Sequence, residues 1–419
     1  MSRAVRLGAL CLLVVLLAFP ALSAFAQDEA LFGTIETGDD EPVAGVLILV
    51  TDESGDEVGT STSDDDGEWR VGLPAAGSYT VSLDESTLPE GVELRSEDVA
   101  STTVDVRAGR ERRVLFPLGE AVAGEGLFDS ISQRLVTGVK VGLIIAITSV
   151  GLSLVFGTTG LINFAHGEMV TFGAIVAWFI NVTLGINLII AAMLTALIGF
   201  LFGTTLDAGL FAPLRRRRIT GFQFLVITIG LSLLLQHLLL IWFGSEFRPY
   251  GDYARQPTMD LGPISINPRD IVVMVLSLAI LIAVATFLQR SRMGRAMRAV
   301  SDNRDLAEAS GVDVQRVVRI VWAVSVGLAS IGGVFLGLVT TVQYLMGFQL
   351  LLLMFAGVIL GGLGSPFGAM VGGLVVGMVS EVSTVWLRVE LKSVWALIVL
   401  IVVLLVRPQG ILGIRERVG

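Results

Sequence analysis

The sequence predicts a polytopic α-helical membrane protein of eight or nine spans, preceded by a small exported β-sandwich domain. The first observation is hydropathy: 53% of the 419 residues are hydrophobic, and several apolar runs exceed the about 18 residues that cross a bilayer. The second is a series of short β-like segments between positions 31 and 118, separated by Gly and Asp clusters. The third is charge, because residues 27–126 hold 24 acidic and 6 basic residues, whereas residues 127–419 hold 14 acidic and 21 basic residues. An acidic exported domain followed by a basic membrane domain accounts for all three.

Residues 1–26 have the pattern of a secretory signal peptide. Arg3 and Arg6 precede an apolar stretch, and the small residues Ala24 and Ala26 predict cleavage before Gln27. The alternative is an uncleaved membrane anchor, and both alternatives place the following domain outside the cytoplasm. The single cysteine of the chain lies in this segment, so the sequence predicts neither a disulfide framework nor a cysteine metal site.

The exported domain is expected at residues 27–120, followed by a linker at 121–130. Its informative segments are Pro42–Val46, the turn Asp65-Asp66-Gly67 before Trp69, and the stretch from Leu73-Pro74 to Val81. In these segments the sequence resembles the carboxypeptidase-regulatory-like, transthyretin-type domains, which implies a small β-sandwich. The acidic residues Asp64–Asp66 are interpreted as a solvated hairpin turn, since the spacing of an EF-hand calcium loop is missing. No metal site and no catalytic residue is expected in this domain.

The membrane domain is expected at residues 131–413, and basic clusters set its orientation. Arg215–Arg218, the loop 289–316 and the arginines from Arg407 onward should be cytoplasmic by the positive-inside rule. Nine crossings alternate correctly through all three clusters when the exported domain lies outside. The expected spans are the apolar runs near 131–156, 168–184, 186–212, 222–243, 270–288, 317–342, 349–363, 368–387 and 391–406.

Glycines are dense where two of these runs adjoin, and several are spaced as small-xxx-small pairs. That spacing lets helix backbones approach closely in a membrane. The candidates for helix packing are Gly361, Gly362, Gly364, Gly368 and Gly372.

Ionisable and amide side chains are sparse within the apolar runs, because such groups are costly when they face lipid. The candidates for lining a transport pathway or stabilising a broken helix are Asn163, His166, Glu168, Gln343 and Glu381. Around His166 two interpretations stay open: the segment lines a pathway, or it caps a helix, with Asn163 as the N-cap and Glu168 in the first turn. We favour the capping interpretation because Asn and Glu are common at helix starts.

The loop at 289–316 is the most informative cytoplasmic segment. Its second half, from Asp302 to Gly311, predicts a short helix with an acidic start and a glycine stop. A folded helix in such a loop indicates docking to a soluble partner. The chain has no GxxxxGK[ST] nucleotide-binding loop and no catalytic motif, so the sequence predicts a transport protein that is not an enzyme and does not itself bind ATP. Its arginines lie at membrane edges, which argues against nucleic-acid binding.

Five motifs, in a fixed order, carry a resemblance to a known family. They are GLINFAHGE at 160–168, MGRAMRA at 293–299, ASGV at 309–312, GGLGSPFGA at 361–369 and RPQGILG at 407–413. The chain resembles the branched-chain amino acid family of ABC-importer permeases, and it is similar to the first, H-type member of that family's permease pairs. The resemblance implies import of branched-chain or other hydrophobic amino acids across a bacterial cell membrane. It also implies a second permease subunit, two cytoplasmic ATPases that bind the ATP, and an extracytoplasmic substrate-binding protein.

On the same resemblance, residues 302–316 are similar to the coupling helix that docks in a cleft of an ATPase. The coupling residues that it implies are Arg304, Asp305, Glu308, Ala309 and Gly311. The exported β-domain departs from the family's usual pattern. We expect this domain to guide a binding protein to the permease or to contact the cell envelope. Its negative charge would attract a basic surface of the partner. Two other functions stay open. A urea or short-amide permease would share the fold, and an ion-coupled secondary transporter would need an acidic network within the spans.

Overall fold

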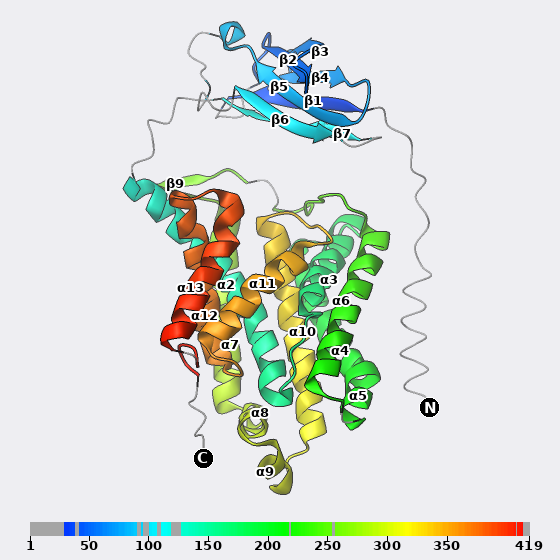
Figure 1. Cartoon of the computed structure of the whole chain (residues 1–419), viewed down its shortest axis with the longest axis vertical. Helices are drawn as coiled ribbons and strands as arrows, with labels where there is room; N and C mark the ends of the chain where they lie inside the picture. Colours follow the sequence, from blue (N-terminus) through cyan, green and yellow to red (C-terminus); the bar gives the residue numbers. More distant parts are fainter. Residues whose placement is uncertain are drawn as a thin grey trace. The chain divides into compact units, whose positions relative to one another are not determined.

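Two compact units make up the chain in the computed structural model (Figure 1). The structure describes residues 29–37, 42–89, 94, 100–106, 110–118, 127–217, 219–253, 256–407 and 409–413. The described residues of the β-unit lie within 14–126, and those of the helical unit lie within 127–419. The predicted signal peptide and residues 121–126 of the predicted linker lie outside the described residues. Residues 127–130 of that linker already belong to the first helix of the helical unit.

The β-unit consists of two sheets around one apolar core. One sheet has the strand order β4-β1-β7, with β8 also paired to β1, and the other has the order β3-β2-β5-β6. Side chains alternate between the core and solvent, so that Ile48 and Val50 of β2 are buried, as are Leu31 and Trp69 of the other sheet. The elements are β1 (Ala30–Glu36), β2 (Leu47–Asp52), β3 (Glu57–Thr62), β4 (Glu68–Gly72), β5 (Gly77–Leu83), the 3-10 turn η1 (Glu85–Thr87), β6 (Ser101–Val106), β7 (Glu111–Arg113) and β8 (Phe116–Pro117).

The acidic turn between β3 and β4 is held by its first carboxylate. The side chain of Asp64 accepts hydrogen bonds from the backbone N–H groups of Asp66 and Glu68, at 3.1 and 2.8 Å. Gly67 has a φ of +73°, which a side-chain-bearing residue rarely adopts. The acidic sequence therefore stabilises the turn of this hairpin.

The helical unit follows the predicted order of apolar runs, each of which coincides with a helix in the described part of the chain. The helices are α2 (Leu127–Thr159), α3 (His166–Trp178) with the π-turn η3 (Phe179–Thr183), α4 (Leu188–Leu206) with the π-turn η4 (Asp207–Phe211), α5 (Ala212–Arg216), α6 (Gly221–Phe243), α7 (Pro268–Arg290), α8 (Arg292–Asp302), α9 (Arg304–Ala309), α10 (Val314–Val339), α11 (Met346–Gly361), α12 (Pro366–Val382) and α13 (Lys392–Val406). A hairpin of β9 (Met259–Leu261) and β10 (Ile264–Ile266) precedes α7, and the 3-10 turns η5 (Ser383–Val385) and η6 (Val389–Leu391) separate α12 from α13.

Among the described residues, six helical stretches are long and apolar enough to cross a membrane. They are 127–159, 188–216, 221–243, 268–290, 314–339 and 366–385, and two shorter apolar helices are α11 and α13. The prediction of eight or nine spans is therefore confirmed only as a helical region with about six candidate spans. The difference arises because α3 and α11 begin after a helix break and α13 has 15 residues, so none of these three helices alone has the length of a span.

The two halves of the helical unit repeat one arrangement in opposite directions. In the first half, α2 is followed by the extended segment 160–165 and then α3; in the second, α10 is followed by 340–345 and then α11. The two helix starts meet, since a Cβ atom at Gly167 would lie 2.6 Å from the carbonyl oxygen of Gly347, and a Cβ at Gly347 would collide with the carbonyl of Gly167. Both helices therefore begin among buried residues, and their backbones touch there.

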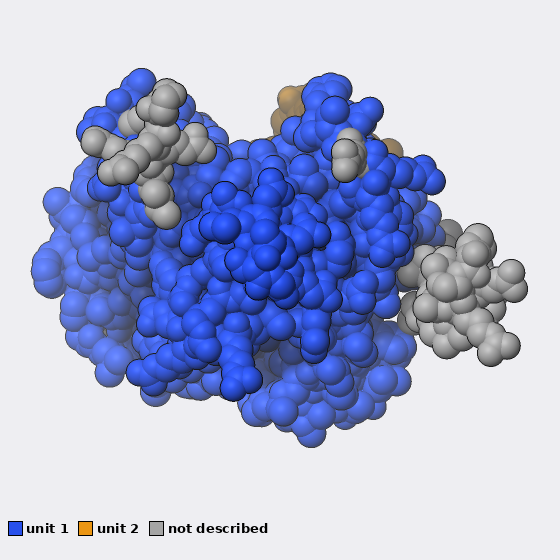
Figure 2. All heavy atoms as spheres, turned by 90° about the horizontal axis from the view of Figure 1, so that it is seen from below, with its two compact units in different colours: residues 1–13, 127–419 blue, residues 14–126 orange. Residues whose placement is uncertain are grey.

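The helical unit has one arginine-rich end. α8 and α9 lie at this end, at the bottom of Figure 1, with α5 and the end of α7 close by. The exposed arginines of this end include Arg216, Arg217, Arg290, Arg295 and Arg316. Figure 2 views the unit from this side. The opposite end carries the β9–β10 hairpin and the end of α10.

Candidate functional site

Three predicted pathway residues lie together at the first helix break. Asn163, His166 and Glu168 are completely buried. The carboxamide oxygen of Asn163 accepts a hydrogen bond from the backbone N–H of Ala165 at 3.1 Å, and Nε2 of His166 lies 3.0 Å from the carbonyl oxygen of Thr148 in α2. Because a carbonyl oxygen only accepts, Nε2 carries the proton of this histidine. The break is thus tied to the long helix beside it.

The prediction that Asn163 caps α3 is wrong. The N-cap position is Ala165, and no side chain forms a cap hydrogen bond there. Asn163 instead turns the chain two residues earlier, so it stabilises the break and not the helix end. Glu168 does lie in the first turn of α3, where the N-terminal dipole favours a carboxylate, and Ser232 of α6 donates a hydrogen bond to its Oε1 at 3.2 Å.

Each of these three residues also keeps one polar atom without a hydrogen bond in the described part of the chain. The atoms are Nδ2 of Asn163, Nδ1 of His166 and Oε2 of Glu168. A buried polar atom without a partner costs about 1–3 kcal/mol. The break is therefore a polar spot within an apolar bundle that is suited to binding water or a polar group of a transported molecule.

The other two pathway candidates lie elsewhere. Gln343 is half-buried in the second break, and its Nε2 donates to Oε1 of Gln349 at 3.0 Å. Glu381 is buried near the end of α12, and its Oε1 lies 3.1 Å from Nζ of Lys392 at the start of α13. The structure thus brings Asn163, His166 and Glu168 together and separates Gln343 and Glu381 from them.

The glycine-rich segment between α11 and α12 is a close backbone contact. A Cβ atom at Gly361 would collide with the carbonyl of Gly368, and one at Gly372 would collide with the carbonyl of Gly357. Gly362 and Gly364 have φ values of +111° and +79°, so they form the turn itself. The C-terminal motif joins this site, because Leu412 donates its N–H to the carbonyl oxygen of Gly361 at 2.9 Å.

The short helix predicted between Asp302 and Gly311 is present as α9, and both of its ends are capped. Asn303 accepts a hydrogen bond from the N–H of Leu306 at 2.9 Å, which makes it the N-cap. At the other end Gly311 has a φ of +84°, its N–H bonds the carbonyl oxygen of Glu308, and the next N–H bonds that of Ala307, each at 3.0 Å. This is a Schellman ending, so the glycine stop has a conformational cause.

The exposed surface of α9 carries both charge and an apolar group. Asp305, Glu308 and Ala309 are exposed, Arg304 is half-buried, and Leu306 is 66% exposed. The exposed leucine therefore lies between two acidic side chains on a capped helix.

α8 connects this surface to the membrane helices. Its residues Met297 and Val300 are buried, and Arg298 donates from Nη1 to the carbonyl oxygen of Leu288 in α7 at 2.9 Å. A Cβ at Gly157, near the end of α2, would lie 2.8 Å from Oγ of Ser301. Movement of α8 and α9 would therefore displace the ends of α7 and α2.

Sequence reasoning missed two buried ion pairs. Asp207 in η4 pairs with Arg215 in α5 at 2.6 Å, and the two side chains are 1% and 5% exposed. Lys140 in α2 pairs with Asp270 in α7 at 2.6 Å. The available signal was an oppositely charged residue inside or beside each apolar run, since an ion within a span needs a partner.

The comparisons with known proteins agree with this architecture. The sequence profile of the carboxypeptidase regulatory-like domain matches residues 30–119. The high-affinity branched-chain amino acid transport system permease protein LivH of Escherichia coli K12 is 31% identical over 304 residues, which cover 68% of this chain and 96% of that protein. BraD of Pseudomonas aeruginosa is 30% identical over 301 residues, covering 68% of this chain and 96% of BraD. The permease LivM of Escherichia coli K12 is more distant, at 24% identity over 314 residues that cover 67% of this chain and 71% of LivM.

The profile described as the permease component of the branched-chain amino acid transport system matches residues 134–405, most of the helical unit. This is a bacterial family of multi-pass membrane permeases and not of enzymes. The chain belongs to the branched-chain amino acid permease family, and it is the permease component of a branched-chain amino acid ABC transport system.

Proposed function

We propose that the chain works in the bacterial cell membrane as one of two permease subunits that import branched-chain or other hydrophobic amino acids. Its partners are a second, LivM-like permease, two cytoplasmic ATPases that bind the ATP, and an extracytoplasmic substrate-binding protein. The similarity to both LivH and LivM supports a paired arrangement, because the two halves of such a pair are related proteins.

The proposed topology has the arginine-rich end in the cytoplasm, as the positive-inside rule requires. The signal peptide ends at residue 26, the β-unit at 27–120 is extracytoplasmic, and a short linker leads to a permease domain that ends near residue 413. Nine crossings satisfy this orientation when the six long helices are joined by α13 and by α3 and α11, each of which completes a span together with the segment before it. A broken helix is tolerated in a membrane where it is buried in protein or lines a cavity, and the breaks hold the buried residues Asn163, Ala165 and Val342.

The coupling mechanism is supported by helix α9, which is capped and exposed and which directly follows α8, a helix with buried residues against the membrane helices. ATP-driven closure of the ATPases would push or pull on Arg304, Asp305, Glu308 and Ala309. Because α8 is anchored on α7 and α2, that force would reach the helices around the first break. Asn163, His166 and Glu168 would then line or release the pathway as α3 and α11 shift.

The β-unit is proposed to guide the binding protein. Residues 27–126 carry a net charge of −18, since they contain 24 acidic and 6 basic residues. Such a field attracts a basic surface over a distance set by ionic strength. Deleting residues 27–120 should reduce uptake at limiting substrate and low salt, and unchanged uptake would count against the guiding role.

Affinity purification tests the assembly directly. The full chain, tagged at Gly419 and extracted in mild detergent, should retain an ATPase, a second permease and a binding protein, which mass spectrometry would identify. A homo-oligomer with no ATPase, even after crosslinking in intact membranes, would sink the importer proposal.

A matched pair of leucine substitutions tests the coupling helix. Leu306→Asp should abolish ATPase stimulation by the liganded binding protein in proteoliposomes. Leu261→Asp, in the β9–β10 hairpin at the other end, should leave it intact, although the two leucines are 66% and 61% exposed. Equal losses in both variants would show that α9 has no special role.

A further inference from the structure

Two neighbouring polar side chains lie on the outside of the leucine-rich helix α6. Gln236 is half-buried and His237 is exposed, and both lie more than one helical turn inside Trp242, near the end of the helix. Tryptophan at the end of a span marks the membrane–water boundary, so the two side chains are at the depth of the apolar layer. Nδ1 of His237 donates to the carbonyl oxygen of Leu233 in its own helix at 2.7 Å, which leaves Nε2 as an acceptor. The carboxamide of Gln236 has no hydrogen bond to another described residue.

The second helix break adds two amide side chains. Gln343 is half-buried and Gln349 is exposed, and Nε2 of Gln343 donates to Oε1 of Gln349 at 3.0 Å. Oε1 of Gln343 and Nε2 of Gln349 have no hydrogen bond to the rest of the described chain. These amides also lie within the membrane layer, because α11 begins against the backbone of α3, where Gly347 meets Gly167.

A small groove joins the polar groups of α6 and α11 into one face. Its volume is about 50 Å³, and its lining is apolar apart from one hydroxyl: Phe164, Ile229, Ser232, Leu233, Phe348 and Leu351. Leu233 lies one turn before His237 on the same side of α6, and Phe348 directly precedes Gln349 in α11. The α6–α11 face comprises the exposed residues Ile229, Leu233, His237, Phe348, Gln349 and Leu352.

The other outward helices have a different surface. Between residues 192 and 202 of α4, and between 272 and 285 of α7, the exposed side chains are hydrocarbon or thioether, and the hydroxyls of Thr195 and Ser277 are buried. Such a surface suits lipid, which offers no hydrogen bonds. Amide and imidazole groups within a span face protein or water instead. The α6–α11 face therefore differs from α4 and α7 in needing a polar neighbour.

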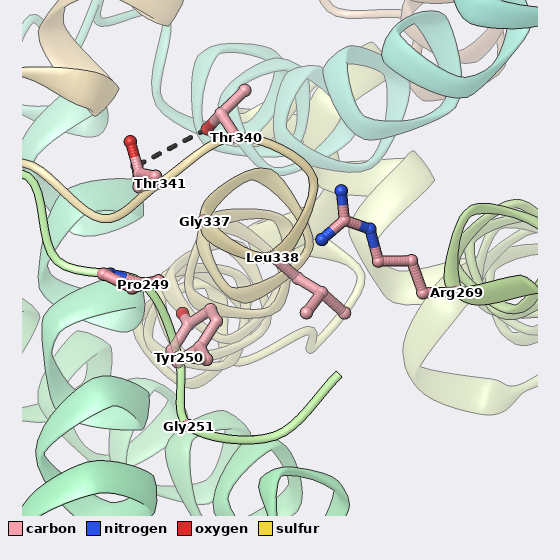
Figure 3. A pocket seen from close by; sticks show the side chains of 8 residues that line it. All are labelled: Pro249, Tyr250, Gly251, Arg269, Gly337, Leu338, Thr340 and Thr341. Atoms are coloured by element: carbon pink, nitrogen blue, oxygen red, sulfur yellow. Dashed lines mark hydrogen bonds between the residues drawn. The ribbon is translucent and has the colours of Figure 1, made fainter. Parts of the chain in front are cut away.

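The outer end of α6 is fastened to the second break. Figure 3 shows the loop at Pro249–Gly251, which follows α6, beside residues 340–341 at the start of that break. The backbones of Arg248 and Val342 exchange hydrogen bonds at 3.0 and 3.1 Å. The loop, the end of α10 and the start of α7 at Arg269 enclose a cleft of about 500 Å³. The two halves of the α6–α11 face are thus held together within this chain.

We propose that the α6–α11 face binds the second permease subunit. That subunit supplies a hydrogen-bond donor to Nε2 of His237 and polar groups to Gln236 and Gln349, and its apolar side chains enter the groove. Of the proposed partners, the ATPases are cytoplasmic and the binding protein is extracytoplasmic, so the second permease is the one that reaches this depth. The inference rests on the proposed function for the existence of that subunit.

Photocrosslinking in intact membranes tests the inference. The probe is p-benzoylphenylalanine, placed singly in the full chain while the other subunits are co-expressed. It replaces Leu233 in the groove, and the matched controls replace Leu197 in α4 and Leu278 in α7. The three leucines are 49%, 56% and 51% exposed. Crosslinking to the second permease should be roughly tenfold higher from position 233 than from either control, because the probe reacts with groups in direct contact.

Removing the polar groups tests what the second permease recognises. The double variant Gln236→Leu with His237→Leu should reduce the second permease that co-purifies in mild detergent by roughly threefold to tenfold, the effect of one or two lost hydrogen bonds. His237→Gln alone should keep most of it, because a carboxamide oxygen accepts as Nε2 does. The amount of full chain in the membrane should stay unchanged in both variants, since neither side chain bonds another helix of this chain.

Three results would overturn the inference. Lipid adducts alone at position 233 would show that this face lies against the bilayer. Crosslinks between two copies of this chain would make it a homodimer contact. Unchanged recovery of the second permease with the double leucine variant would show that the polar groups are not recognised. A complex that lacks any second permease would refute the proposed function, whereas a second permease that crosslinks only from position 197 or 278 would refute this inference alone.

Discussion

Removal of one member of the Asp207–Arg215 pair should destabilise the helical unit more than any surface substitution. Oδ1 of Asp207 lies 2.6 Å from Nη2 of Arg215, and the side chains are 1% and 5% exposed. Breaking a buried ion pair from one side costs about 3–5 kcal/mol, because the remaining charge is left without compensation. Asp207→Asn should fall in this range, since it leaves Arg215 buried and also removes the carboxylate that lies 4.0 Å from Nε of Arg319.

Arg215→Met should cost less than Asp207→Asn, because Asp207 keeps the contact with Arg319. The double variant should recover most of the loss, so the coupling energy of the cycle should be about 2–4 kcal/mol. The free energy of unfolding can be measured by SDS titration with tryptophan fluorescence. Trp322 is a local probe, since its ring stacks on that of Phe211 at a centroid distance of 4.1 Å.

The refuting result is simple to recognise. If both single variants lose less than about 1 kcal/mol, the pair behaves like an exposed salt bridge and the buried-charge reasoning is wrong. If the free energy of unfolding of the double variant falls by the sum of the two single losses, the coupling energy is zero, and the close contact between the two side chains does not contribute to stability.

Three further predictions concern glycine and the β-core. Gly377→Ala should destabilise the protein by about 1–3 kcal/mol in a thermal-unfolding assay, because its Cβ would collide with Gly142 of α2. The control is Gly230→Ala in α6, where a Cβ meets nothing within 4 Å. This variant should have unchanged or higher stability in the same assay. Gly311→Ala should weaken coupled ATPase activity, and Gly311→Asn should largely preserve it, since asparagine tolerates a φ of +84° better than alanine; equal activities would contradict this. Trp69→Ala should cost the β-unit about 3–5 kcal/mol, because the indole is 3% exposed. In the full-length Trp69→Ala variant, a protease should cleave the β-unit faster than in the natural chain. An unchanged cleavage rate would contradict the expected loss of stability.

The arrangement of the helices follows from hydropathy, but the helix breaks do not. Apolar runs fix where helices occur, because a bilayer requires continuous hydrogen bonding within each span. Both breaks have an aliphatic residue, an amide and an aromatic residue in the same order, followed by a glycine: 162–164 with Gly167, and 342–344 with Gly347. This similarity is short, and the contact between Gly167 and Gly347 depends on the packing of the two breaks, which no local pattern contains.

The candidate sites divide in the same way. The ends of α9 were predictable, because Asp302–Gly311 contains its own start and stop signals. The N-cap assignment for Asn163 failed because an asparagine before a helix can also form a turn two residues further out. The cleft around Arg269 was not predictable, since its lining comes from three segments that only the packing of α7 against α10 and the preceding loop brings together.

The contact between Gly167 and Gly347 restricts how this transporter can switch. The two backbones touch there, and the hydroxyl of Thr171 in α3 also accepts a hydrogen bond from the N–H of Gly347 at 3.0 Å. Displacing the start of α3 or of α11 by itself would disrupt this close backbone contact. A transport cycle in which α3 moved without α11 would have to break this contact, so we expect the starts of the two helices to move together.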